Sequence, residues 1–137
     1  MGLDMYAYVV DEELVESDFG FKGEEPGVQR LHYWRKHHDL HGWMEDLWRS
    51  KLEKYPDNEK FQSLVSDDFN CRPVRLTLED LDDLELAVKN RSLPRTTGFF
   101  FGDSPPDDYS IANDLQFISK ARIEIDMGKA VFYDSWW

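Results

Sequence analysis

The chain has 137 residues, of which 41% are hydrophobic and 15% aromatic, a composition typical of one folded domain with a packed core. Its formal net charge of −12 opposes binding to duplex nucleic acid and to anionic lipid surfaces. Cys71 is the only cysteine, so no internal disulfide can form, and no apolar run is long enough to cross a membrane, which together lead us to expect a cytoplasmic protein.

The first predicted element is a strand over residues 3–10, LDMYAYVV, which are rich in aromatic and β-branched side chains. Residues 11–27 follow with three glycines and Pro26, and this composition indicates a surface loop.

A long helix is predicted over residues 31–55. Its apolar side chains recur at three- and four-residue steps, as expected for one buried helical stripe, and Pro56 ends the pattern. The members of this stripe are Tyr33, Leu40, Met44, Leu47 and Trp48. The next segment, residues 57–71, is polar, with room for one short helical turn around Phe61.

A short strand at residues 74–77 should lead directly into a second helix. Thr77, followed three residues later by Asp80, resembles a helix-capping arrangement, and acids in the first turns suit the positive end of the helix dipole. We interpret this helix as mostly structural, with an apolar stripe made of Leu78, Leu81, Leu84 and Val88.

The last third of the chain contains an aromatic segment, a helix and a strand. Residues 98–102, GFFFG, suggest either a buried strand or a glycine-flanked loop near a ligand. Ile111, Leu115 and Ile118 mark a third helix, Gly128 permits a turn, and residues 130–136 indicate a final strand that we expect to lie inside the sheet. The whole chain, residues 1–137, is therefore predicted to be a single α+β domain, with a small, mostly antiparallel or mixed sheet and about three helices packed on it.

The stretch R-K-H-H-D-L-H-G-W at residues 35–43 is the strongest candidate site. His37 and His41 stand four residues apart, the spacing of the two zinc ligands in the H-E-x-x-H motif. The glutamate of that motif is replaced by His38, and no third ligand is marked in the sequence. A metal-assisted hydrolase using His37 and His41 is therefore kept only as an alternative.

An anion site is favoured over a metal site in the same stretch. Residues 29–38 contain three basic residues and no acid, in a chain that is otherwise acidic. Arg35 offers bidentate contacts to phosphate or carboxylate, Lys36 a point charge, and His41 a donor that can be protonated. Trp34 or Trp43 could supply a flat face for a base or sugar, and Gly102 and Asp103 could add donors.

Four segments occur together in this chain: MGLDMYAY at the start, YWRKHHDLHGWM at residues 33–44, LPRTTGFFFG at residues 93–102 and FYDSWW at the end. In this order they resemble a family of small uncharacterised proteins encoded by bacteriophages and bacterial genomes. Some members are described as phosphoglycerate kinases, but 137 residues cannot hold that enzyme's two domains, and no nucleotide-binding glycine loop is present. The resemblance implies that Tyr33, Trp34, Arg35, Lys36, His41 and Trp43 belong to the family pattern.

These observations lead to one main hypothesis and two alternatives. The main hypothesis is a phage-associated binding protein, without catalytic residues or a cofactor, that holds a small anionic ligand such as a nucleotide and could sequester a host defence signal. The first alternative is an acidic interaction module that binds and inhibits a basic host protein through Asp82, Asp83 and Glu85. The second is the hydrolase using His37 and His41.

Overall fold

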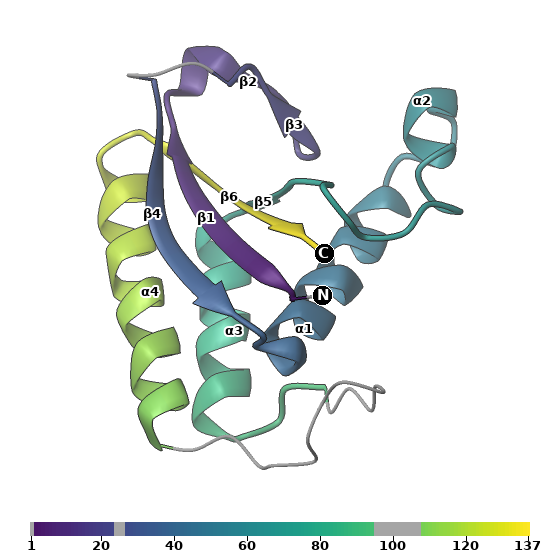
Figure 1. Ribbon diagram of the computed structural model, residues 1–137. Helices are drawn as coiled ribbons and strands as arrows, with labels where there is room; N and C mark the ends of the chain where they lie inside the picture. Colours follow the sequence, from purple (N-terminus) through teal and green to yellow (C-terminus); the bar gives the residue numbers. More distant parts are fainter. Residues whose placement is uncertain (1, 24–26, 95–107) are drawn as a thin grey trace.

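A four-stranded antiparallel sheet, covered on one face by helices, forms the body of the computed structural model (Figure 1). The structure describes residues 2–23, 27–94 and 108–137. Helices and a mostly antiparallel sheet in one body confirm the predicted α+β class. Among the described residues, no helix is both long enough and apolar enough to cross a membrane.

The sheet has the order β4-β1-β6-β5, so the first and last strands of the chain lie side by side at its centre. Its strands are β1 (Asp4–Val10), β4 (Val28–Arg35), β5 (Val74–Leu76) and β6 (Ala130–Trp136). Three of them, β1, β5 and β6, lie where the sequence predicts strands. The central position of β6 also confirms that the C-terminal strand is inserted into the sheet.

The prediction of one helix over residues 31–55 is wrong in its first part. Residues Val28–Arg35 form β4, and α1 begins only at His38 and ends at Leu52. In β4 the side chains of His32 and Trp34 are buried while those of Tyr33 and Arg35 are exposed, which is the two-residue period of a strand. The apolar spacing that predicts a helix is therefore real only from Leu40 onward.

The other helices agree more closely with the sequence. They are α2 (Glu59–Gln62), α3 (Leu78–Lys89) and α4 (Asp108–Asp126). Leu78 is 41% exposed and does not join the buried stripe of α3. The predicted loop at residues 11–27 holds a short 3-10 helix, η1 (Glu12–Leu14), and a small hairpin of β2 (Val15–Ser17) and β3 (Gly20–Phe21). The GFFFG segment, with Gly102 and Asp103, lies outside the described residues.

The two faces of the sheet are packed differently. On the helix face, side chains such as Met5, Ala7 and Tyr133 are buried in one large cluster with residues of α1, α3 and α4. On the opposite face the β2-β3 hairpin covers only one end, where the ring of Phe21 lies 4.8 Å from that of Phe132. Among the described residues, no helix covers the rest of this second face (Figure 1).

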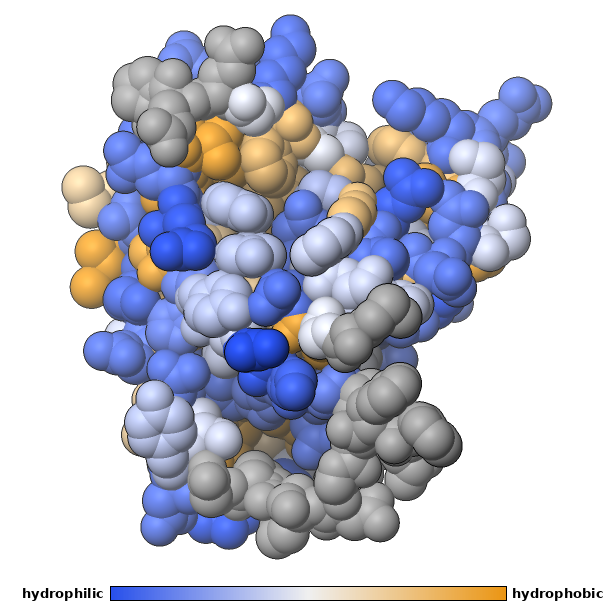
Figure 2. Space-filling model, in the orientation of Figure 1, coloured by the Kyte–Doolittle hydropathy of each residue, from blue (hydrophilic) through white to orange (hydrophobic). Residues whose placement is uncertain are grey.

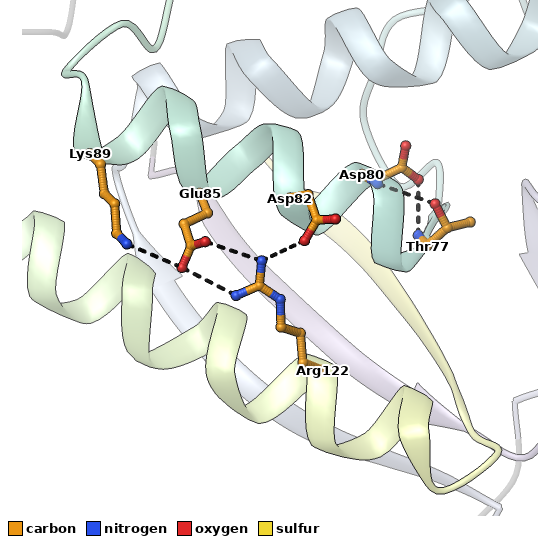
Figure 3. A network of polar contacts seen from close by, with 6 residues as sticks. All are labelled: Thr77, Asp80, Asp82, Glu85, Lys89 and Arg122. Carbon is orange, nitrogen blue, oxygen red and sulfur yellow. Dashed lines mark hydrogen bonds and ion pairs between the residues drawn. The ribbon is translucent and has the colours of Figure 1, made fainter.

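A buried lysine joins α1 to the start of α3. The Lys51 ammonium lies 2.7 Å from the Asp80 carboxylate, and the two side chains are only 5% and 14% exposed. Asp80 also completes the capping box with Thr77, as the sequence predicts, accepting from the Thr77 backbone N–H at 2.9 Å (Figure 3). Lys51 donates in addition to the carbonyl of Arg75, so one ammonium ties together α1, β5 and α3.

A second ionic contact joins α3 to α4 at the surface. The Arg122 guanidinium of α4 donates to Asp82 at 2.7 Å and to Glu85 at 3.2 Å, and Lys89 approaches Glu85 from the other side (Figure 3). The hydrogen bond from Arg122 lowers the pKa of Glu85. Because these groups are partly exposed, water screens their attraction and each pair contributes little.

We predict that removing Lys51 destabilises the protein much more than removing Arg122. Lys51→Ala leaves the Asp80 carboxylate largely buried without its cation and should lower the free energy of unfolding by about 3 kcal/mol. Arg122→Ala, the surface control, should lower it by less than about 1 kcal/mol. Urea denaturation of both variants measures the difference, and equal losses would contradict this ranking.

Candidate functional site

The stretch that sequence analysis singles out is a strand-to-helix junction. β4 ends at Arg35, Lys36 adopts a left-handed conformation with φ of 57°, and His37 occupies the N-cap position of α1. Such a φ is uncommon for a residue with a side chain, and here the Lys36 N–H is held by a 2.8 Å hydrogen bond to the carbonyl of Leu3. The chain therefore changes from strand to helix within two residues, and Arg35, Lys36 and His37 are presented at one corner.

A buried carboxyl group of α4 fixes this corner. One oxygen of Asp114 accepts a hydrogen bond from the Trp34 indole N–H at 3.0 Å, and the other lies 2.8 Å from Nε2 of His37. Asp114 is only 2% exposed, so both oxygens depend on these partners rather than on water. The contacts hold the end of β4, the start of α1 and the body of α4 in one arrangement.

A pocket of about 270 Å³ lies beside the Asp114 contacts. The junction supplies one wall, and α4 supplies the other. Its lining residues are Tyr33, Trp34, Arg35, Lys36, His37, Tyr109, Ser110 and Asn113. We call this the junction pocket.

The described residues that line the junction pocket include two cations and no carboxylate, in an acidic protein. Within the part of the chain that the structure describes, neither Arg35 nor Lys36 has a carboxylate within 4.0 Å. Tyr109 and Ser110 belong to the first turn of α4, where the helix dipole is positive. These features favour a bound anion.

His41, predicted as a protonatable donor in the same site, lies elsewhere. Its Nδ1 is 2.7 Å from the hydroxyl of Tyr133, and its ring stacks on Phe69 at 5.1 Å. Burial lowers the pKa of His41 to about 4, so the ring is neutral near pH 7. His41 does not line the junction pocket, and the prediction that it contributes positive charge there is wrong.

The predicted tryptophans also have structural surroundings. Trp34 touches the junction pocket but is only 4% exposed, because its ring packs edge-on against Phe117 at 4.7 Å. The Trp34 ring therefore offers no open flat face to a base or sugar. Trp43 is partly buried against the main core. Gly102 and Asp103 are outside the described residues and stay predictions.

The two histidines of the metal alternative turn to different partners, His37 to Asp114 and His41 to Tyr133. In residues 2–23, 27–94 and 108–137 there is no group of three His, Cys, Asp or Glu side chains placed to hold a metal ion. The geometry therefore gives no support to a hydrolase built on His37 and His41.

The α4 side of the pocket was missed by sequence analysis. Tyr109, Ser110 and Asn113 are polar residues of an amphipathic helix and carry no recognisable motif. The position of Asp114 could have been recognised from the sequence, because it stands three residues after Ile111 and four before Ile118, within the apolar stripe of the helix. An acid at such a position must find buried hydrogen-bond donors.

The acidic helix α3, the basis of the protein-interaction alternative, is partly neutralised within the molecule. Asp82 and Glu85 both pair with Arg122 of α4. Charge reversal at either position would therefore also disturb the contact between α3 and α4, and Asp83 is the one member of that predicted acidic surface for which no such pair is found among the described residues.

Comparison with known proteins places the chain in no family: no family model matches it, and no curated protein or solved structure is significantly similar to it. The resemblance to the phage and bacterial family stays a prediction.

We predict that His41 contributes to acid denaturation. Its pKa is about 4 in the folded protein against 6.5 when exposed, so the unfolded chain binds the proton more tightly. Stability is therefore lost as the pH falls from about 6.5 to about 4, by about 3 kcal/mol in all. His41→Gln can still hydrogen-bond to Tyr133 but cannot titrate, and its free energy of unfolding should fall by less over this range.

Urea denaturation at several pH values measures this effect, with the wild type and His41→Gln compared at each. Above about pH 7 both proteins should show the same pH dependence, because His41 is neutral in both the folded and the unfolded wild type. Parallel curves for the two proteins down to about pH 4 would contradict the assignment.

Proposed function

We propose that this protein is a binding protein for a small anion, a phosphate- or carboxylate-bearing molecule held in the junction pocket. The observation that carries this proposal is the pairing of Arg35 and Lys36, without carboxylate partners among the described residues, at the wall of a pocket whose other wall is the first turn of α4. A guanidinium contacts phosphate or carboxylate with two parallel hydrogen bonds, and an ammonium adds charge without a fixed direction.

The size of the pocket limits the ligand. A volume of about 270 Å³ is slightly below the usual range for small-molecule sites, so it suits a phosphate group with a small attached group. The net charge of −12 repels long polyanions, which must also approach the rest of the acidic surface. A small anion that enters the pocket interacts mainly with the local positive charge.

Asp114 has a positioning role in this proposal. Both of its oxygens are engaged by Trp34 and His37, so its negative charge is turned into the protein. Through these contacts it fixes the side chain of His37 and the end of β4, from which Arg35 projects. We propose binding rather than catalysis at this site. If the resemblance to phage proteins holds, sequestering a host signal that bears a phosphate group would be one use.

Isothermal titration with inorganic phosphate and with ribose 5-phosphate tests the proposal. Arg35→Ala should weaken binding of both by at least about tenfold, because a charge-assisted bidentate contact is lost. Lys36→Gly should also weaken binding. Its melting temperature should rise slightly or stay unchanged, because glycine adopts a φ of 57° without strain. This variant separates binding from folding.

Lys89→Ala, which removes a cation from the exposed end of α3, is the matched control and should bind like the wild type. The proposal is wrong if the wild type binds neither anion at about 10 mM, a concentration at which even a weak phosphate site is largely occupied. It is equally wrong if Arg35→Ala and Lys89→Ala bind with the same affinity.

A further inference from the structure

A second and larger hollow lies on the face of the sheet that the helices leave open. Its volume is about 680 Å³, within the range of sites for small organic molecules. The residues that line it are Tyr6, Tyr8, Phe21, Gly23, Val28, Arg30 and Asp134. We call it the sheet groove. Figure 2 looks onto this face and shows pale, weakly polar side chains gathered over β1, β4 and β6 between strongly hydrophilic ones.

Aromatic rings form the floor of the sheet groove. Tyr6 and Tyr8, two residues apart on β1, lie 6.0 Å apart with their planes 24° from parallel. Phe21 of the hairpin extends the row, 6.2 Å from Tyr8. Rings that lie side by side on the open face of a sheet form a surface on which a flat ligand ring can stack.

Two charges of opposite sign face the groove without neutralising each other. The Asp134 carboxyl accepts a hydrogen bond from the adjacent Ser135 N–H at 2.8 Å, and it has no cation within 4.0 Å among the described residues. Burial raises the pKa of Asp134 to about 6, so it is ionised near pH 7 despite the cost of its surroundings. The Arg30 guanidinium lies 5.7 Å from the ring of Tyr33 and likewise lacks a described carboxylate partner.

We propose that the sheet groove binds a monomeric guanine nucleotide, with the base stacked on the tyrosines, its N–H edge on Asp134 and its phosphate on Arg30. Guanine presents two adjacent N–H donors, which one carboxylate can accept together, whereas adenine offers only its amino group on that side. A carboxylate, a guanidinium and a row of rings are together complementary to a flat donor that carries a negative group. A single-stranded polymer would present the same chemistry, but the charge of −12 disfavours it.

This inference does not depend on anion binding at the junction pocket. No residue lines both cavities: the junction pocket is built from the end of β4 and from α4, and the sheet groove from β1, β3, β6 and the first half of β4. Variants of one site should therefore leave the other intact.

The test is titration of the full chain with guanosine monophosphate, followed by calorimetry and by the quenching of tyrosine and tryptophan fluorescence. Asp134→Asn keeps the side-chain oxygen that accepts from Ser135 and loses the charge, and it should weaken binding by about tenfold or more. Arg30→Met should weaken the binding of guanosine monophosphate by a similar factor. Its affinity for guanosine, which has no phosphate, should stay within about twofold of the wild-type value. Adenosine monophosphate should bind at least about tenfold more weakly than guanosine monophosphate.

Arg35→Ala is the control, because it alters the junction pocket and should bind guanosine monophosphate like the wild type. The proposal is overturned if the wild type shows no binding at about 5 mM guanosine monophosphate. It is also overturned if Asp134→Asn binds as tightly as the wild type. Loss of binding in Arg35→Ala would overturn it too, because the nucleotide would then bind in the junction pocket and not in the sheet groove. The denaturation midpoint of each variant is measured in parallel, so that loss of folding is not read as loss of binding.

Discussion

The buried carboxyl group of Asp114 is the constraint on which the junction depends. It brings an indole N–H from β4 and an imidazole nitrogen from the start of α1 to one point on α4. An acid at 2% exposure is tolerated only when both oxygens are satisfied, so the three elements must meet in this one way. The sharp turn at Lys36 and the outward position of Arg35 and Lys36 follow from that meeting, and so does the shape of the junction pocket.

Acidic and basic side chains in this protein are concentrated in different elements rather than spread evenly. Arg122 pairs with Asp82 and Glu85 of α3, and Lys51 pairs with Asp80 at the start of that helix. The cations of β4 and of the turn after it, in contrast, have no carboxylate within 4.0 Å among the described residues. Two partly buried titrating groups act in opposite directions between about pH 4 and pH 6. Ionisation of Asp134 opposes folding as the pH rises, and protonation of His41 opposes folding as the pH falls.

The sequence was sufficient for elements whose pattern is local. The Thr77 capping box, the apolar stripe of α4 and the β-branched and aromatic runs of β1 and β6 each depend on neighbouring residues, and each was predicted. The strand β4 was missed because the turn at Lys36 carries no glycine or proline. In the site, Arg35 and Lys36 were predicted from charge alone. The position of His41 away from the pocket could not be predicted in this way, because it depends on a hydrogen bond to Tyr133, which is 92 residues away in the chain.

The β-bulge in the long outer strand bears on how copies of this protein behave at high concentration. Leu31 is the extra residue opposite the step from Ala7 to Tyr8, and its carbonyl accepts a 3.0 Å hydrogen bond from Lys120 of α4. Strands at the border of a sheet invite pairing with another chain, and a bulge, together with a lysine, is a common protection against it. With an extra residue in β4 and the Leu31 carbonyl already bonded to Lys120, the border of β4 is a less regular template for pairing with the strand of another chain.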